Sequence, residues 1–301
     1  MNSARISVRP AVCWLAPLLA LLLLLVVRLL LQRRGEPDAA RRLPEPPLPD
    51  VAGGKVPFKL RLWGSALLMF FVPTMLRQMF RHASGSSRAL QRAVESPDEY
   101  RQKARYSLPF TGEWYVFNGG VNKSDSHSWE VVGQRYAYDF VVADDALRRW
   151  PGGKRGTHLE DYFCYGQPIL APAPGVVVEV RDSVPDAPGP GTGWVDPFTR
   201  DFRGNYVTIQ HAEDEYSFLA HLVPESICAK RGDRVERGQK IGRCGNSGHS
   251  TEPHLHFHVQ DRADFLKPQG FLSSSTTFRS TAEKLSQAVA WSVARTYPQS
   301  S

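Results

Sequence analysis

The chain has little cysteine: four residues in 301, no two of them with the CxxC spacing of a zinc knuckle. So few cysteines also exclude a disulfide-rich scaffold. Cys13 lies in an apolar run. For Cys228 and Cys244 we expect small buried side chains, with a disulfide between them as the alternative if their strands are neighbours.

An HExxH motif is also absent, which excludes a zinc site built on one helix with a glutamate base.

The last two thirds of the chain have no excess of positively charged residues. Residues 1–105 hold 17 Lys/Arg and 7 Asp/Glu, a net charge of +10, whereas residues 106–301 hold 20 and 23, a net charge of −3. Because the basic residues flank apolar runs and not the globular part, they indicate membrane topology and not a nucleic-acid surface.

The first apolar run, residues 11–31, contains one charged residue, Arg28. As a helix it would reach about 30 Å, enough to cross the hydrocarbon core of a bilayer. A cleaved signal peptide is the alternative, but the run is long and no small-x-small cleavage site follows it directly. We therefore predict that residues 1–31 form an uncleaved transmembrane anchor.

A second apolar segment, residues 62–81, follows a linker. The linker, residues 32–61, is rich in proline and arginine and cannot bury a core. The apolar part of the second segment reaches only about 22 Å and is interrupted by Pro73, so it either spans the bilayer poorly or lies in the interface. Seven Lys/Arg from Arg33 to Arg61 place the linker in the cytoplasm, and two spans then leave the C-terminal part outside.

Residues 106–270 are predicted to form a β domain, because short apolar runs of period two alternate with Gly/Pro/Asp clusters. The strands are expected at residues 168–171, 175–181, 205–211, 216–222, 240–244 and 254–259. A Gly/Pro-rich loop is expected at residues 182–203. The tail, residues 271–301, contains a candidate amphipathic helix at residues 281–296.

The strand pattern assigns faces to several histidines. With a four-residue turn at residues 212–215, the flanking strands form a hairpin with one shared face. That face carries Val207, Ile209, His211, Phe218 and Ala220. His221 then lies on the opposite face.

A second pattern is PHLHFHV, in which three histidines alternate with three apolar residues. One face carries His254, His256 and His258, and the other carries Leu255, Phe257 and Val259. Neighbouring imidazoles on this face would be about 7 Å apart. That spacing is too wide for both to bind one ion comfortably, but it suits one ligand and one neighbour that acts on a bound substrate.

Five segments occur in order at short spacing: GQPILAPAPGVVVEV, GNYVTIQH, YSFLAHL, RGDRVERGQKIGRCGNSG and STEPHLHFHV. Over residues 166–259 they resemble the core of the lysostaphin-type zinc endopeptidases, duplicated-hybrid-motif peptidases that cut peptide bonds in bacterial peptidoglycan. The resemblance implies a mainly β fold, an antiparallel β-sandwich with zinc in an open groove, here preceded by one or two N-terminal membrane helices.

The same resemblance implies a set of site residues. The second histidine of HxH, His256, binds zinc, and so does an upstream aspartate, here Asp139 in QRYAYDF. The first histidine of HxH, His254, and the histidine of AHL, His221, flank the metal as catalytic residues.

The third ligand departs from the family pattern. Arg135 stands four residues before the aspartate, where relatives carry a histidine, and it cannot bind a cation. His127, in an SHSW segment of the kind some relatives carry, is the predicted replacement, and Asp125 is the alternative. With Asp139 and His256, His127 would leave the open fourth position of a catalytic zinc site.

Such a zinc lowers the pKa of a water molecule and polarises the scissile carbonyl. His221 and His254 would orient the water and hydrogen-bond the developing oxyanion, and either could take the proton. The other histidines are expected outside this chemistry: His211 as a structural residue, His258 lining the groove. Solvated positions are expected for His82, His158 and His249.

The sequence therefore predicts a membrane-anchored zinc metallo-endopeptidase that hydrolyses peptidoglycan, with its catalytic domain outside the cytoplasm, where that substrate lies. The departure at Arg135 supports an alternative, an inactive module of the same fold that binds peptidoglycan or regulates another wall hydrolase. PAPGVVVEV with GDRVERGQKI also resembles a biotinyl or lipoyl carrier domain. Such a domain needs an exposed lysine on a tight hairpin, which is missing between Val180 and Cys228.

Overall fold

The computed structural model describes residues 58–90, 102–119, 134, 136–154 and 156–265, and the side chains of all of these except residues 58–59 and 82–90. All of them belong to one compact unit, Pro47–Ser301. Several predicted features lie outside the described residues. These are the anchor, most of the linker, Asp125, His127, Arg135 and the helix at residues 281–296.

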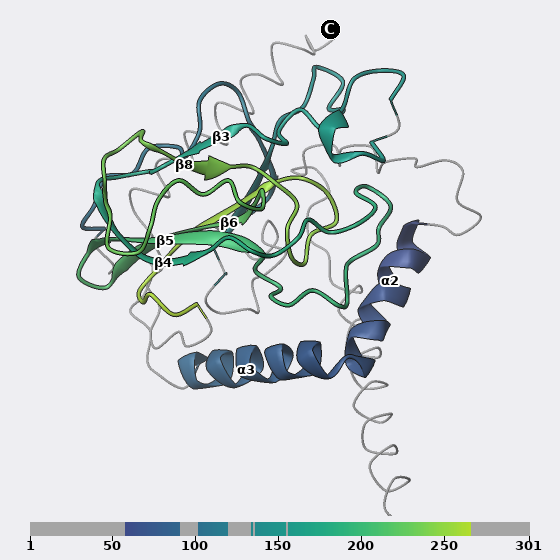
Figure 1. The fold of residues 1–301 in the computed structure, drawn as a ribbon, viewed down its shortest axis with the longest axis horizontal. Coiled ribbons are helices and arrows are strands. Elements are labelled where there is room, and N and C mark those ends of the chain that lie inside the picture. Colours follow the sequence, from purple (N-terminus) through teal and green to yellow (C-terminus); the bar gives the residue numbers. More distant parts are fainter. Residues whose placement is uncertain (1–57, 91–101, 120–133, 135, 155, 266–301) are drawn as a thin grey trace, which may run out of the picture. The chain divides into compact units, whose positions relative to one another are not determined.

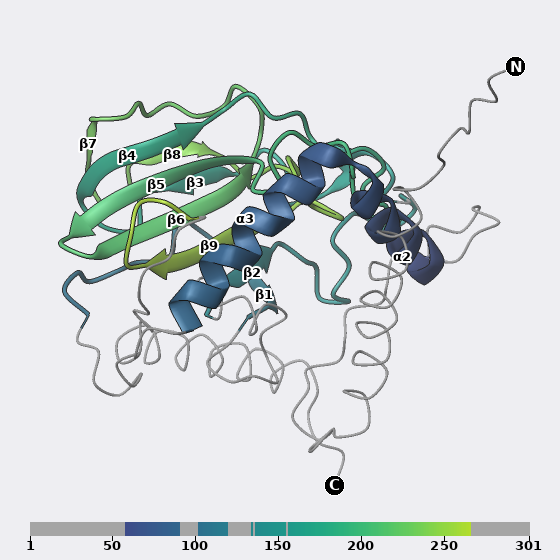
Figure 2. The same ribbon diagram turned by 90° about the horizontal axis from the view of Figure 1, so that it is seen from below.

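The larger of two sheets is antiparallel and has seven strands (Figure 2). Its strands, in spatial order, are β1 (Tyr115–Asn118), β2 (Tyr138–Val141), β9 (Leu255–Gln260), β6 (Glu215–Leu222), β5 (Asn205–Ala212), β4 (Gly175–Arg181) and β7 (Arg234–Val235). The predicted strands are confirmed to within one residue at each end. The sequence pattern did not identify β1, β2 and β7 as strands.

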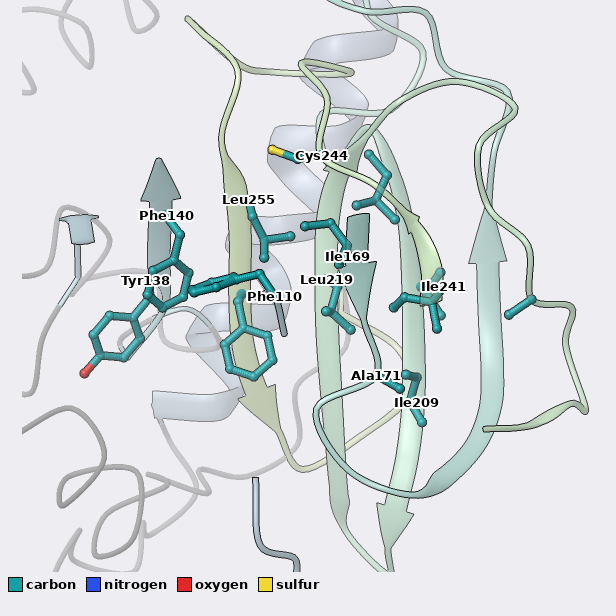
Figure 3. Packing of buried hydrophobic residues seen from close by; sticks show 14 of the residues in the cluster. Phe110, Tyr138, Phe140, Ile169, Ala171, Ile209, Leu219, Ile241, Cys244 and Leu255 are labelled. Carbon is teal, nitrogen blue, oxygen red and sulfur yellow. The ribbon is translucent and has the colours of Figure 1, made fainter. Parts of the chain in front are cut away.

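A second sheet of two strands, β3 (Pro168–Leu170) and β8 (Lys240–Arg243), covers part of the large sheet (Figure 1). Ile169 and Ile241 from this small sheet belong to the same buried cluster as Ile209, Leu219 and Leu255 of the large sheet (Figure 3). Each of these five side chains is fully shielded from solvent, so the core lies between the two sheets. The prediction of a mainly β, antiparallel core is confirmed.

The hairpin of β5 and β6 differs from the prediction by one residue. Thr208 pairs with Phe218, and Ala212 pairs with Glu215. The turn therefore contains two residues, with Asp214 at a φ of 56°, and a bulge falls at His211. Because a slip of one residue moves side chains to the opposite face, the expected placement of Phe218 with Val207 is wrong. The face shared with Val207 and Ile209 instead carries Ser217 and Leu219.

Strand β9 has the alternation expected from its sequence. Leu255, Phe257 and Val259 belong to the core cluster. His256 and His258 lie on the other face, opposite Ala220 and Phe218 of β6. His254 precedes the strand and pairs with Gly245 through an isolated bridge.

The second apolar segment folds as α2 (Phe58–Leu68), the 3₁₀ turn η2 (Met69–Phe71) and α3 (Pro73–Leu90). Helix α3 begins at Pro73, whose ring fits the first turn of a helix but not its interior. Met69 and Met75 are buried against Val195, whose backbone N–H donates to Ser65 Oγ at 3.2 Å. Within the described ranges, no helix has both the length and the apolar character needed to cross a membrane.

Residues 182–203 form the irregular loop that was predicted. The prediction of a buried side chain is confirmed for Cys244 and is wrong for Cys228, which is exposed; Cys164 is also buried. All three thiols are free, so the alternative disulfide between Cys228 and Cys244 is not formed in this structure.

Candidate metal and catalytic site

Strand pairing places Asp139 directly opposite His256. Tyr138 and Phe140, the neighbours of Asp139 on β2, enter the hydrophobic core, so the Asp139 side chain points to the other face of the sheet. His256 Nδ1 lies 2.9 Å from Asp139 Oδ1. Asn118 on the adjacent β1 donates from Nδ2 to Asp139 Oδ2 at 3.3 Å, which orients the carboxylate.

A bulge in β6 brings His221 to the same side. Leu219 pairs with Val207 and Leu222 pairs with Asn205, so three steps on β6 match two on β5. The extra residue is accommodated at His221, whose φ of 61° lies in the left-handed region. Bulges of this kind re-aim one side chain while the strand continues. Without it, His221 would follow the alternation into the core.

The imidazoles of His221, His254 and His256 form one cluster, in which His221 and His256 are buried and His254 is partly buried. The ring centroids of His221 and His254 are 4.7 Å apart, and those of His221 and His256 are 5.9 Å apart. His254 Nε2 lies 3.7 Å from Asp139 Oδ1. Burial, and then the neighbouring His254 and His256, lower the pKa of His221 well below its usual range, so this ring is neutral near pH 7.

Backbone carbonyls determine which nitrogen of two catalytic candidates carries the proton. His221 Nδ1 lies 2.8 Å from Ser247 O, and His254 Nδ1 lies 2.8 Å from Glu252 O. A carbonyl oxygen only accepts, so both Nδ1 atoms donate. In the neutral rings, both Nε2 atoms therefore keep a lone pair that can accept a proton.

The segment that carries these carbonyls is held rigidly. Gly248 has a φ of 80°, and a Cβ there would lie 2.3 Å from the backbone nitrogen of Gly204, so only glycine fits this close approach. Beside it, Arg149 Nε donates to Glu252 Oε2 at 2.7 Å in a buried ion pair. Both contacts fix the loop between β8 and β9, from which His254 projects.

His258 lies beneath His256 and does not line an open groove, in contrast to the prediction. Its ring is 1% exposed, its Nδ1 lies 3.1 Å from His256 Nε2, and its Nε2 lies 2.9 Å from Gln260 Oε1. Burial lowers the pKa of His258 to about 3. This buried polar chain from Asp139 to Gln260 was not predicted, although the continued alternation through Gln260 was visible in the sequence.

The remaining histidines agree with their expected roles where they are described. His211 lies 2.8 Å from Pro174 O and 2.7 Å from Ser217 Oγ, on the face opposite His256. His158 and His249 are exposed. The prediction for His82 falls on a side chain outside those that the structure describes.

Asp139 and His256 have the chemistry and the spacing of two zinc ligands. One oxygen and one imidazole nitrogen are typical zinc donors, and two ligands of a tetrahedral zinc lie about 3.3 Å apart, near the 2.9 Å seen here. Across the described residues, no set of three or more His, Cys, Asp or Glu side chains is arranged to hold a metal. The predicted third ligand, His127, lies outside them.

Comparison with known proteins identifies the class of this domain. Residues 156–268 match peptidase family M23, a match that includes His221, His254 and His256 and begins after Asp139. This part of the chain is therefore an M23 peptidase domain, which confirms the lysostaphin-type resemblance.

Individual relatives match only this domain. Peptidoglycan DD-endopeptidase ShyA of Vibrio cholerae is 35% identical over 94 residues, 31% of this chain and 17% of that protein. Glycyl-glycine endopeptidase ALE-1 of Staphylococcus capitis is 33% identical over 129 residues, 39% of this chain and 31% of that protein. The chain thus spans less than a third of the length of either relative.

Similar solved structures include a zinc-containing peptidase from Vibrio cholerae, with 25% identity and a TM-score of 0.33 over 53% of this chain and 37% of that chain. The catalytic domain of lysostaphin from Staphylococcus simulans is 20% identical with a TM-score of 0.29, over 54% of this chain and 85% of that domain.

Proposed function

We propose that this protein is a membrane-attached zinc endopeptidase that hydrolyses peptide bonds in bacterial peptidoglycan, with its M23 domain outside the cytoplasm. The observation that carries the proposal is the cluster of Asp139, His221, His254 and His256, drawn from three strands and one loop onto one side of the sheet. Two relatives named as endopeptidases, ShyA and ALE-1, support the substrate class.

Asp139 Oδ1 and His256 Nδ1 would hold the zinc, with His127 as the third ligand. When bound, the metal supplies Lewis acidity for the scissile carbonyl and for the attacking water. Asn118 keeps the Asp139 carboxylate oriented through its bond to Oδ2, which leaves Oδ1 for the metal.

His221 and His254 would handle the proton. Both present an Nε2 lone pair, because Ser247 O and Glu252 O hold the proton on Nδ1. One ring can therefore accept the proton of the attacking water at Nε2 and become a cation that donates a hydrogen bond to the developing oxyanion. Such a donor in a water-poor site contributes about 3–4 kcal/mol to transition-state stabilisation.

The helical segment supports attachment to a membrane. Its exposed large apolar side chains are Leu60, Trp63, Leu67, Leu68, Phe71, Met79 and Phe80. Residues 58–90 contain five Lys/Arg and no Asp/Glu, a charge that complements anionic lipid. A photo-cross-linking side chain at Phe71 should capture lipid, whereas one at Phe198, an equally exposed loop residue, should not.

The orientation follows from the basic linker, which the positive-inside rule assigns to the cytoplasm. Protease added to spheroplasts should therefore digest residues 106–301. Protection of the M23 domain in intact spheroplasts, together with digestion after lysis, would contradict the proposed topology.

The enzymatic proposal is tested with the purified full-length chain in detergent. We expect about one zinc per chain and release of peptides from peptidoglycan sacculi. His127→Ala should lose the metal, whereas His211→Gln, which alters a half-buried histidine on the far face, should keep it. If His127→Ala retains zinc as well as the wild type does, the assignment of the third ligand is wrong.

The second candidate function is the inactive module, favoured by Arg135 at the usual ligand position. A chain that holds no zinc, releases no peptides and still sediments with sacculi would establish this alternative.

A further inference from the structure

We infer that His258 and Gln260 are positioning residues: they hold a proton on His256 Nε2, so that Nδ1 is the nitrogen that faces a metal beside Asp139. The inference rests on the proposed role of His256 as a zinc ligand. It follows from the direction of four hydrogen bonds, which is fixed at one end by backbone carbonyls.

The chain of bonds begins at Gln260. Its Nε2 lies 2.6 Å from Arg262 O and 3.3 Å from Ala263 O. Carbonyl oxygens only accept, so the amide nitrogen must face them, and the reversed amide would place Oε1 against two oxygens. Gln260 Oε1 therefore faces His258 Nε2 at 2.9 Å, and because this oxygen only accepts, His258 Nε2 carries a hydrogen.

The next bond links the two histidines. His258 is fully buried, and burial keeps an imidazole neutral. With its one proton on Nε2, its Nδ1 is an acceptor. The partner of that Nδ1 is His256 Nε2 at 3.1 Å, which must therefore donate.

The last contact is the one at the metal site. When His256 carries a single ring proton, that proton is on Nε2, so Nδ1 directs a lone pair toward Asp139 Oδ1, 2.9 Å away. Two acceptors this close repel each other unless a cation lies between them. A ring without this constraint would carry its proton on Nδ1 and donate it to Asp139, and a metal would have to displace that hydrogen bond.

The neighbouring histidines show that the constraint is specific to His256. His221 and His254 hold their protons on Nδ1, where backbone carbonyls accept them. His256 has the opposite arrangement although all three rings lie in one cluster. The ring nitrogen that keeps its lone pair is therefore Nδ1 in His256, the proposed metal ligand, and Nε2 in the neighbouring His221 and His254.

The test uses full-length chain labelled with ¹⁵N-histidine, because imidazole ¹⁵N chemical shifts separate protonated from unprotonated ring nitrogens. In wild type, with zinc removed or bound, His256 Nε2 should be protonated. In His258→Leu, which removes the acceptor, neutral zinc-free His256 should carry its proton on Nδ1. Zinc affinity, measured by competition with a chromophoric chelator, should fall about 10- to 100-fold, as for other partners that orient metal ligands.

Two further variants separate positioning from packing. His258→Gln keeps an acceptor oxygen and should restore protonation of His256 Nε2 and most of the zinc affinity. His211→Gln alters a half-buried histidine outside the site and should change neither. If His258→Leu fails to fold, Gln260→Met removes the terminal acceptor and should shift the same resonances in the same direction.

An unprotonated His256 Nε2 in the wild type overturns the inference, and so does wild-type zinc affinity in a folded His258→Leu. If the wild-type chain binds no zinc, the proposed function fails, while the protonation of His256 Nε2 in that same chain still decides the inference.

Discussion

Both faces of strand β9 are buried, but one contributes to the hydrophobic core and the other to the candidate metal site. On one face Leu255, Phe257 and Val259 fill the core between the sheets. On the other, His256, His258 and Gln260 are joined by hydrogen bonds that run in one direction. On the apolar face, stability depends on the volume of the side chains, and neighbouring residues can shift to fill part of a cavity. On the polar face, the hydrogen-bond pattern depends on which ring nitrogen carries each proton. Four predictions follow from this contrast, from the largest effect to the smallest.

His256→Ala should remove the proposed metal ligand from the polar face with little change in the core. We expect loss of bound zinc and a fall in peptidase activity of about 10³-fold or more, since metal Lewis acidity contributes several kcal/mol to the transition state. Zinc content and peptide release from sacculi measure the effect. Retention of stoichiometric zinc would show that His256 is not a ligand.

Phe257→Ala should damage the other face of the same strand. Removal of this ring, 1% exposed, should lower the free energy of unfolding by about 3–5 kcal/mol. Urea denaturation followed by circular dichroism measures the change. Folded Phe257→Ala should still bind zinc, and Phe257→Leu should cost much less; equal losses from both would argue against a volume effect.

His221→Gln tests the polar cluster from strand β6. The amide can still donate to Ser247 O but cannot accept a proton as imidazole does. Activity should fall about 10²- to 10³-fold in kcat while zinc content stays unchanged. A parallel loss of zinc would mean that His221 is a ligand and not a proton carrier.

Asp261→Asn concerns the residue that directly follows β9. Burial raises the pKa of Asp261 to about 6, above its value in the unfolded chain, so the stability of the folded state falls as the pH rises from about 4 to about 6, and the full loss remains above pH 6. Because the side chain is partly solvated, the asparagine should add about 1 kcal/mol at pH 7. This gain should vanish below about pH 4, as urea titrations at the two pH values would show.

The sequence predicted the two faces of β9 because strict alternation leaves little freedom. It could not predict how His221 joins them. The two-residue turn shifts the hairpin register, and the bulge at His221 then reverses the side once more. Both are backbone adjustments that depend on neighbouring strands. Neither has a marker in the local sequence.

The buried chain through His258 and Gln260 was also missed, for a different reason. A polar residue on a strand face is normally read as pointing to solvent, and only the packing of Phe218 and Phe265 against His258 shows that this face is covered. Asn118 was missed because β1 is short and its four residues are all half-buried.

The position of His221 in the site depends on one extra residue in strand β6. A substitution there changes one side chain, but deletion of Ala220 would remove the extra residue, let the strand run on regularly and move the histidine into the position that Ala220 holds opposite His256. Transplantation of this histidine cluster onto another β scaffold would therefore have to carry over an irregular backbone along with the residues themselves.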